Sequence, residues 1–366
     1  MSKGDNLKKY IVLVSGAIGG AEKRFFDIFK GLSLIDDDVY LVVPSCLINL
    51  IGKEEDLSKY LNKIIILDIP HWSPLSFAKK FYKSVLRKSD KEDYFHYPLS
   101  PLFFLHFFTR RKYGISFCDC HFLPKLSLRN KNASLQWLAS FFAEKVDVLS
   151  PDILKLAGKE LKHIENKASL TPGGTYIFPS DDIVVPKARK VIFISRLEPN
   201  KGVDVLFDIL PLINQCLSAN EKVTFHVYGE GSLAGFVKAQ VEKYKNLGID
   251  IEYHGYGVID KILPDAWCVL SLQSVTNYPS RVVAEALLAG CEVIISDTGN
   301  SRDFGVGKGV SYLYSNYSNL SELTNEITQR SSYKNDGVIE SIKADSIAKF
   351  SSPSYLNYMR SLLKAN

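Results

Sequence analysis

The residues from 274 to 299 include types that could bind a phosphate-containing ligand. An apolar strand is predicted just before them, and a short helix is predicted to start at Pro279 and to end at Gly290. Backbone N–H groups at such a helix start attract phosphate. Glu285 lies about one turn into this helix, where its carboxylate could accept hydrogen bonds from the two hydroxyls of a ribose. The alternative is an ordinary βαβ unit in which Glu285 is only solvated.

Two cationic side chains, Arg196 and Lys201, share one loop between a predicted strand at 191–195 and a predicted helix at 203–216. Because both follow the same strand, both can face one site. An arginine offers a planar fork of donors and a lysine offers a point charge, and together they can offset the negative charge of a diphosphate. Two exposed charges on a loop are the alternative interpretation of these residues.

These two segments resemble the donor-binding signature of retaining GT-B glycosyltransferases of family 4. The loop with Arg196 and Lys201 is similar to the family's Gly-Arg-Leu-x-x-x-Lys-Gly segment, with Ser195 in place of the first glycine. The residues of the second segment that match the signature are Ser274, Tyr278, Pro279, Glu285, Ala286, Gly290, Asp297 and Gly299. Asn277 departs from it, because the family has a glutamate there. An amide donates as well as accepts hydrogen bonds, so this departure predicts an unusual donor sugar or a weak activity.

The resemblance implies transfer of a sugar from a UDP- or GDP-sugar to an acceptor hydroxyl, with retention at the anomeric carbon. It implies that Arg196 and Lys201 are catalytic and stabilise the departing diphosphate. It also implies that Glu285 holds the ribose and that Asn277 lies by the donor sugar. The other substrate-binding residues that it implies are Tyr278, Pro279, Ser280, Arg281, Val282, Tyr256 beside the nucleotide base and Gly229 of a Gly-x-Gly turn.

The N-terminal half adds weaker signals for the same expected site. A glycine-rich turn follows the apolar strand 10–14, and the segment that begins with Gly19 and Gly20 resembles the Gly-Gly-Ala-Glu-Arg start of the family. The resemblance implies that this glycine pair approaches the substrate, although a tight strand-to-helix turn would use the same residues. His121 closes a predicted strand at its carboxyl end, where α/β proteins bind ligands. The resemblance implies a histidine near the sugar on the N-terminal domain and makes His121 the candidate catalytic histidine, and a structural histidine is the alternative. Poorer candidates are His96 and His106.

The order of the apolar stretches predicts the fold. Strands and helices alternate along the 366 residues, which is typical of parallel, doubly wound sheets. With the resemblance, we expect an α/β protein of GT-B type, with two Rossmann-like doubly wound domains that face a central cleft. We expect an acceptor-binding domain at 1–185 and a nucleotide-sugar-binding domain at 186–350. A helix at 351–366 is expected to cross back to the first domain.

A basic and aromatic region occupies residues 71–131. It holds twelve Lys or Arg residues against four Asp or Glu residues, an excess larger than the net charge of +5 of the whole chain. Aromatic side chains beside basic ones suit an anionic membrane surface or a lipid-linked substrate. Helices packed on a sheet, with basic side chains that reach out to water, are the alternative. No signature of an RNA- or DNA-binding module accompanies the region, so nucleic acid is not an expected partner.

The sequence shows no membrane-spanning segment. No apolar run approaches the length that crosses a bilayer, and the first residues lack the apolar core of a signal peptide. We therefore expect a cytoplasmic protein that lies peripherally on the inner face of the cytoplasmic membrane.

The expected chemistry needs no metal and no cofactor, because basic residues and helix dipoles serve that role in GT-B enzymes. Two short metal-like motifs are weak. Cys118-Asp119-Cys120-His121 has no second ligand pair at zinc spacing. Asp36-Asp37-Asp38 precedes a strand at a turn, where the three carboxylates are expected to be solvated.

The predicted activity is therefore that of a hexosyltransferase in bacterial surface-polysaccharide synthesis, such as lipopolysaccharide O-antigen or capsule, with a lipid-linked glycan as acceptor. One alternative is a non-catalytic nucleotide-sugar-binding partner of a transferase, which the departure at Asn277 suggests. Another is a GT-B nucleotide-sugar epimerase, whereas the short chain disfavours a phosphorylase. A nicotinamide dehydrogenase is disfavoured because no Gly-x-Gly-x-x-Gly follows the first strand.

Overall fold

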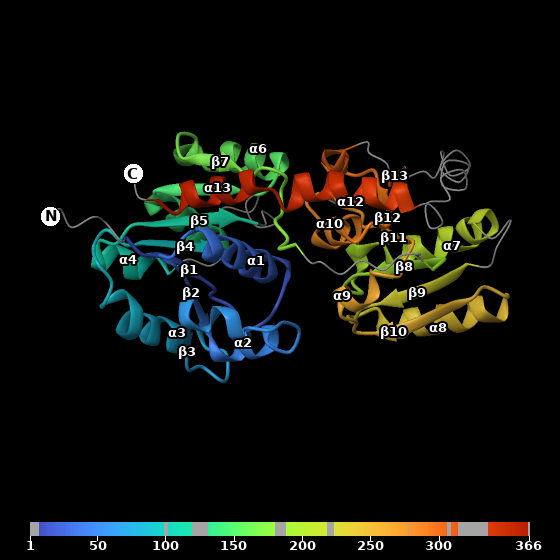
Figure 1. Cartoon of the computed structure of the whole chain (residues 1–366), viewed down its shortest axis with the longest axis horizontal. Helices are drawn as coiled ribbons and strands as arrows, with labels where there is room; N and C mark the ends of the chain where they lie inside the picture. Colours follow the sequence, from blue (N-terminus) through green and yellow to red (C-terminus); the bar gives the residue numbers. More distant parts are fainter. Residues whose placement is uncertain are drawn as a thin grey trace. The chain divides into compact units, whose positions relative to one another are not determined.

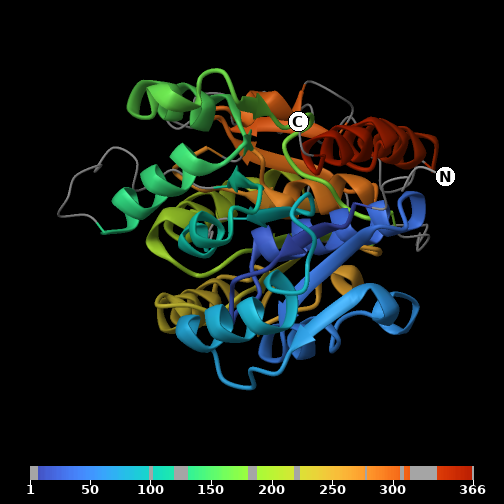
Figure 2. The ribbon, with the colours of Figure 1, turned by 90° about the vertical axis from the view of Figure 1, so that its left-hand side faces the viewer.

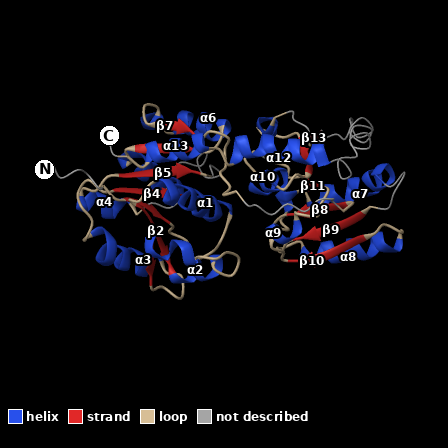
Figure 3. Ribbon diagram, in the orientation of Figure 1, coloured by secondary structure: helices blue, strands red, loops and turns tan. Residues whose placement is uncertain are grey.

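The structure is a computed structural model that describes residues 7–98, 102–118, 131–179, 188–217, 223–276, 278–305, 309–313 and 336–364. The chain divides into two compact units (Figure 1). The first unit comprises Met1–Phe178 and Ser352–Asn366, and the second unit comprises Pro179–Ser351. Each unit contains a parallel sheet with helices packed on it (Figure 3). The prediction of two doubly wound α/β domains is confirmed, and the central cleft stays a prediction.

The sheet of the first unit has seven described strands in the order β3-β2-β1-β4-β5-β6-β7, and every neighbouring pair is parallel. The strands are β1 (Lys9–Val12), β2 (Val39–Pro44), β3 (Ile64–Leu67), β4 (Tyr94–Pro98), β5 (Tyr113–Phe117), β6 (Lys145–Val148) and β7 (Ala168–Leu170). Ile11 and Val12 of β1 point to opposite faces and both are fully buried, which explains the continuous apolar run. The strand order reverses between β1 and β4, and such a switch point is where parallel sheets bind ligands.

Helices cover both faces of this first sheet. They are α1 (Gly20–Ile35), α2 (Ser45–Ile51), α3 (Pro74–Phe81), α4 (Phe103–Thr109), α5 (Lys131–Phe142), α6 (Pro151–Glu160) and α13 (Pro353–Leu362). One core joins Val12 to Phe77 and Phe81 of α3, and the other joins Ile11 to Phe25 of α1. The apolar residues that the sequence places at helical spacing are therefore the inner faces of these helices.

The last helix, α13, belongs to the first unit and lies against α1 (Figures 1 and 2). Tyr355 and Met359 are fully buried in the same core as Phe25. Tyr355 also accepts a hydrogen bond of 2.8 Å at its hydroxyl from Nε of the buried Arg24. Apolar packing and a buried hydrogen bond therefore both hold α13, at the end of the chain, on the first unit.

The aspartate triplet after α1 is only partly solvated, so the expectation for Asp36 is wrong. Its side chain is 5% exposed and forms ion pairs with Lys9 and with Arg360 of α13. Burial opposes ionisation of Asp36, but the hydrogen bonds from Lys9 and other donors outweigh it, and the pKa of this carboxyl lies below its usual value. Two cations from distant segments therefore account for the burial of one acid, whereas Asp37 stays exposed.

The sheet of the second unit has six described strands in the order β10-β9-β8-β11-β12-β13, again with parallel neighbours only. The strands are β8 (Lys190–Ile194), β9 (Thr224–Tyr228), β10 (Ile251–Gly255), β11 (Cys268–Ser271), β12 (Glu292–Ser296) and β13 (Val310–Leu313). The helices are α7 (Val203–Leu217), α8 (Ala234–Asn246), α9 (Ile259–Ile262), α10 (Arg281–Leu288) and α12 (Asp336–Phe350). The strand order reverses between β8 and β11, so a ligand is expected beyond the carboxyl ends of these two strands.

Candidate active site

The loops after β8 and β11 meet at the switch point of the second sheet. The backbone N–H of Ser274 donates to the carbonyl of Asn200 at 3.3 Å. The ammonium of Lys201 donates to the side-chain oxygen of Gln273 at 2.9 Å. The side-chain nitrogen of Gln273 in turn donates to the carbonyl of Thr276 at 2.7 Å. Lys201 and the start of the 274–280 loop are therefore joined, although about seventy residues separate them in sequence.

The close approach of these two loops depends on Gly202. This residue ends a short 3₁₀ turn, Pro199–Lys201, and has a φ of 76°, a left-handed conformation that favours glycine. A Cβ at this position would lie 2.0 Å from the carbonyl oxygen of Leu272. No side chain fits there without a backbone shift. The close approach of Gly202 to Leu272 therefore lets the ammonium of Lys201 reach Gln273 in the loop after β11.

Arg196 lies at the exposed start of the same loop, directly after β8. Its neighbour Leu197 is fully buried and anchors the loop in the core. The turn with Gly229 packs on this backbone, because a Cβ at Gly229 would lie 1.8 Å from the carbonyl oxygen of Ser195. The backbone N–H of Leu197 also donates to the carbonyl of Glu230 at 2.9 Å. Gly229 thus supports the Arg196 loop through a close backbone contact.

Arg281 and Glu285 form an ion pair on α10. Nε of Arg281 donates to Oε1 of Glu285 at 2.7 Å, and the two side chains are 15% and 9% exposed. The i, i+4 spacing places them on one face of the helix. A carboxylate has several acceptor sites, so Arg281 can orient Glu285 while the carboxylate accepts other hydrogen bonds. The sequence resemblance gave both residues substrate-binding roles and did not include this pairing.

Tyr278 packs into the second unit rather than standing free. Its ring meets Phe304 edge to face, with 5.1 Å between the ring centroids, and the ammonium of Lys349 lies 5.8 Å from the Tyr278 ring centroid. Burial, helped by the charge of Asp303, raises the pKa of Tyr278 to about 12. A cis peptide bond joins Tyr278 to Pro279. The side chain of Tyr278 therefore fixes the loop just before α10 begins.

The other predicted residues of the second unit lie around these loops. Ser280 is the N-cap of α10, and Val282 is a half-buried residue of its first turn. Tyr256 follows β10 and is 60% exposed. Asn277 lies outside the described residues. The structure thus brings Lys201 to the 274–280 loop, and Arg281 to Glu285.

The predicted residues of the first unit are described within that unit alone. Gly19 is the N-cap of α1, and Gly20 is its first residue, after β1 at the switch point of the first sheet. Neither glycine has a positive φ, so the turn does not require glycine conformations here. His121 lies outside the described residues.

A buried polar network that the resemblance did not include lies behind this turn. Nη2 of Arg24 pairs with Oδ2 of Asp147 at 3.2 Å, and both side chains are almost fully buried. Ser116 donates to Asp147 at 2.7 Å, so its hydroxyl accepts the Nε2–H of His96 at 2.8 Å. Burial is the main cause that lowers the pKa of His96, to about 4, so this histidine is neutral at pH 7. Tyr358 of α13 completes the set through a 2.8 Å hydrogen bond to Asp147.

His106 is also a core residue. Its Nε2 lies 2.5 Å from the hydroxyl of Tyr97, and burial is the main cause that lowers its pKa to about 3. A neutral, fully enclosed imidazole between aromatic rings has a structural role.

None of the helices in the described part of the chain combines the length and the apolar character that crossing a bilayer demands.

Known proteins resemble the second unit in sequence and the whole chain in fold. Residues 188–330 match the family described as Glycosyl transferases group 1. The poly(ribitol-phosphate) alpha-N-acetylglucosaminyltransferase of Staphylococcus aureus (strain COL) is 28% identical over 138 residues, which are 37% of this chain. These residues span about a quarter of that relative, 27% of its length.

Several solved structures cover nearly the whole chain, among them the following two. The Anabaena Alr3699/HepE structure in complex with UDP superposes with a TM-score of 0.71 at 16% identity, over 98% of this chain and 99% of that one. The apo form of the lipopolysaccharide outer core galactosyltransferase WaaB gives a TM-score of 0.60 at 13% identity, over 97% and 98% of the two chains. These likenesses confirm the GT-B fold class.

Proposed function

We propose that this chain is a glycosyltransferase that moves a sugar from a UDP- or GDP-sugar to an acceptor hydroxyl. The observation that carries the proposal is the contact between Lys201 and Gln273, which joins the two loops at the β8/β11 switch point. The match of residues 188–330 to a glycosyltransferase family supports it. UDP is the first nucleotide to test, because the Anabaena protein is described in complex with UDP and with UDP-glucose.

In the proposed reaction, Arg196 and Lys201 stabilise the charge that builds on the diphosphate as the bond between its oxygen and the anomeric carbon breaks. Glu285, oriented by Arg281, accepts hydrogen bonds from the ribose hydroxyls, and the start of α10 adds backbone N–H donors. Tyr256 serves the nucleotide base, and Asn277 lies by the donor sugar. We propose retention of the anomeric configuration and membership of family 4 on the same motifs.

The proposed chemistry needs no metal at the diphosphate, because cationic side chains and a helix N-terminus supply the positive charge. Activity should therefore survive an excess of EDTA. His121 is the proposed catalytic histidine of the first unit, with Gly19 and Gly20 near the substrate.

The proposed acceptor is a lipid-linked glycan of a bacterial surface polysaccharide, such as O-antigen or capsule. The relative from Staphylococcus aureus is named for transfer of N-acetylglucosamine to poly(ribitol-phosphate), which is also a polymeric acceptor. The proposed location is the cytoplasm, peripherally on the inner face of the membrane, where a lipid-linked acceptor is reached.

An exposed aromatic patch on the first unit supports the proposal of membrane contact. The aromatic patch comprises Phe107 and Phe108 of α4 with Phe141 and Phe142 of α5, all 42–79% exposed. Their rings touch one another, because Phe107 contacts both Phe108 and Phe142 edge to face. Such rings suit the level of lipid headgroups.

The experiment that tests the function uses purified full-length chain with radiolabelled UDP- and GDP-sugars and a membrane extract as acceptor. Turnover of one donor, with the sugar recovered in the lipid fraction, supports the proposal. Binding of UDP without transfer or hydrolysis favours the alternative of a non-catalytic nucleotide-sugar-binding partner, to which the departure at Asn277 points. Conversion of the donor to its epimer favours the epimerase.

A further inference from the structure

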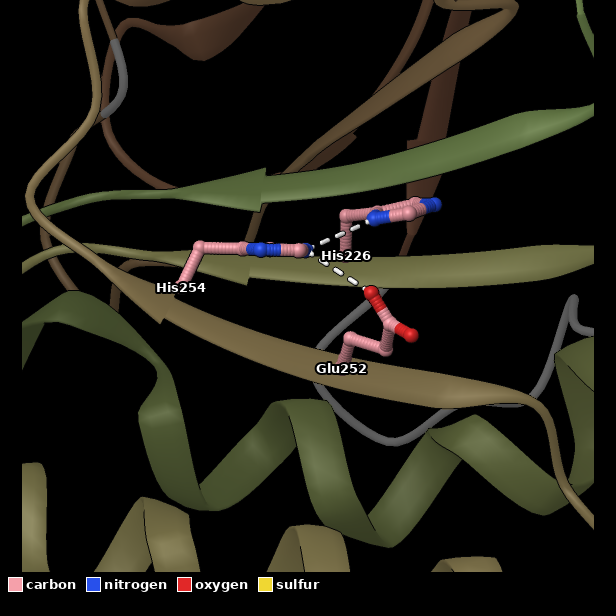
Figure 4. Close-up of side chains that lie close together, drawn as sticks. All are labelled: His226, Glu252 and His254. Atoms are coloured by element: carbon pink, nitrogen blue, oxygen red, sulfur yellow. Dashed lines mark hydrogen bonds and ion pairs between the residues drawn. The ribbon is translucent and has the colours of Figure 1, made fainter.

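Three side chains that can ligate a metal converge on one face of the second sheet. They are His226 of β9 and Glu252 and His254 of β10, and Figure 4 shows their side chains pointing toward one another. Nδ1 of His226 lies 2.8 Å from Nε2 of His254, which lies 3.5 Å from Oε2 of Glu252. One ligand atom from each residue lies within 4.8 Å of the other two. The sequence motifs gave no sign of this cluster.

The sheet itself builds the cluster. His226 pairs directly with Glu252 in the register of β9 and β10, so both side chains leave the same face. The next residue of each strand, Val227 after His226 and Tyr253 after Glu252, points to the opposite face and packs into the core. Register then shifts after Tyr253, so His254 is the extra residue of a bulge. A bulge re-aims a side chain, and here it leaves His254 beside His226.

Neighbouring groups hold the two imidazoles in place. The Nε2 of His226 lies 3.2 Å from the hydroxyl of Thr224, an arrangement that lets Nε2–H donate and leaves Nδ1 as the electron-pair donor. Metal-binding histidines usually donate their other N–H to an oxygen in this way. The ring of Tyr228 stacks on His254, with 4.6 Å between centroids.

We propose that His226, Glu252 and His254 form a binding site for a divalent transition-metal ion, with Zn²⁺ as the best fit. Two imidazole nitrogens and a carboxylate are an established zinc ligand set, with water in the fourth position. Zinc bonds of about 2.0–2.1 Å in a tetrahedron place ligand atoms roughly 3.3 Å apart. The contacts of 2.8 and 3.5 Å bracket that value, and all three ligand atoms lie within 4.8 Å of one another, so side-chain rotation can bring them around one ion.

The electrostatic surroundings allow a cation. Glu252 supplies one negative charge, and Asp250 and Asp265 lie close enough to influence the β9–β10 face. Among the described residues, Lys190 opposes a cation at His226, and its ammonium is paired with the carboxylate of Asp265. The side chains of Glu252 and His254 are 55% and 31% exposed, and His226 is partly exposed, so an ion can enter from water.

The proposed ion would tie the edge strand β10 to β9 just below two turns. The turn with Gly229 follows β9, and the turn with Tyr256 follows β10. The backbone N–H of Gly229 already donates to the carbonyl of Gly255 at 2.7 Å. The ion therefore has a structural role outside the proposed sugar transfer, which itself uses no metal.

The test uses the full-length chain without an affinity tag, freed of metal with EDTA and then dialysed. Zn²⁺ titration by calorimetry should give one ion per chain with a Kd on the order of 1 μM. Co²⁺ should give visible absorption bands of a tetrahedral site without sulfur charge-transfer bands. Each of His226→Ala, His254→Ala and Glu252→Gln should weaken Zn²⁺ binding at least about tenfold. The matched control His71→Ala removes an exposed histidine and should bind as the parent does.

Three results would overturn the proposal. The first is an absence of Zn²⁺ binding by the folded parent chain up to about 1 mM, which would leave a simple hydrogen-bonded histidine pair. The second is binding that the ligand variants leave unchanged, and the third is a Co²⁺ spectrum with sulfur bands, which would assign the ion to cysteines. Circular dichroism identifies a variant that fails to fold, and Glu252→Gln, the most conservative change, then decides. None of these measurements requires donor or acceptor, so they stand apart from the sugar-transfer assay.

Discussion

The ammonium of Lys201 and the side-chain oxygen of Gln273 lie 2.9 Å apart and connect the loops after β8 and β11. This contact aligns the ammonium with the loop that leads into α10. The same hydrogen bond makes Gln273 a positioning residue for Lys201. The consequences for catalysis can be measured with substitutions at both ends.

Lys201→Ala should lower kcat by about 10²–10³-fold, because the departing diphosphate loses a positioned positive charge. Arg196→Ala should have an effect of the same order. Gln273→Ala keeps the ammonium but removes its partner, so a smaller loss of about tenfold is expected. Steady-state rates of donor turnover measure all three. Lys243→Ala, an exposed lysine of α8, is the matched control, and an equal loss in that variant would contradict the assignment.

Glu285→Gln should weaken UDP binding about tenfold to a hundredfold, because a neutral amide replaces the acceptor of charged hydrogen bonds. The change also removes the negative charge from the pair with Arg281, whose 2.7 Å contact is mostly shielded from water. Calorimetric titration with UDP gives the affinity. Arg281→Gln separates the two effects, since it leaves the carboxylate in place. An unchanged UDP affinity in Glu285→Gln would place the ribose elsewhere.

The chain should lose stability as pH falls from 7 to 5, because His96 and His106 are buried in the neutral form. Burial lowers their pKa to about 4 and about 3, against about 6.5 in the unfolded chain. Below pH 6.5 the two histidines bind protons in the unfolded state but stay neutral in the folded state. The free energy of unfolding therefore keeps its full value above pH 6.5, and it decreases as the pH falls toward the pKa of the histidine in the folded state. Each histidine should cost about 2 kcal/mol of the free energy of unfolding at pH 5 relative to pH 7.

Urea unfolding at pH 7 and pH 5 measures this loss. His96→Asn should reduce the loss of unfolding free energy between pH 7 and pH 5 by the contribution of one histidine. This holds even if the substitution itself changes the stability at pH 7. His71→Gln alters an exposed histidine and should leave the dependence unchanged. A pH dependence that His96→Asn does not reduce would show that His96 takes up its proton without unfolding.

Apolar runs, and the glycines and prolines that interrupt them, made the helices and strands predictable. The strand expected at 191–195 is β8, and the helix expected at 203–216 is α7. The helix between Pro279 and Gly290 is α10, which begins two residues after the proline. In each case a buried strand or helix face leaves a periodic apolar pattern that glycine or proline interrupts.

Contacts between distant residues could not be predicted in the same way. The bond between Lys201 and Gln273 depends on β11 being the neighbour of β8, which sequence order does not reveal. The burial of Asp36 depends on Arg360, which arrives from the end of the chain. The histidines of β9 and β10 meet through a register shift without a motif. The Arg281–Glu285 pair was different, because its i, i+4 spacing was visible in the sequence.

The aromatic patch should contribute to binding of anionic vesicles. Phe107 and Phe108 are 60% and 79% exposed, and Arg110 follows directly after α4. Lys167 adds a second positive charge at the end of α5, where its ammonium donates to the carbonyl of Phe141 at 2.8 Å. Rings that insert among headgroups gain free energy by leaving water, and the cations gain from anionic lipid.

Phe107→Ser combined with Phe108→Ser should weaken binding to vesicles that contain phosphatidylglycerol by about tenfold or more. Co-sedimentation measures the bound fraction, and added salt should lower it further because exposed charges are screened. Phe236→Ser removes a similarly exposed phenylalanine, 42% exposed on α8 of the second unit, and should leave vesicle binding intact. Equal losses in the two variants would point to general destabilisation. A parent chain that stays in the supernatant at low salt would remove the support for a membrane-bound acceptor. The assignment of the donor site to the second unit would be unaffected, because the Lys201 and Glu285 variants test it separately.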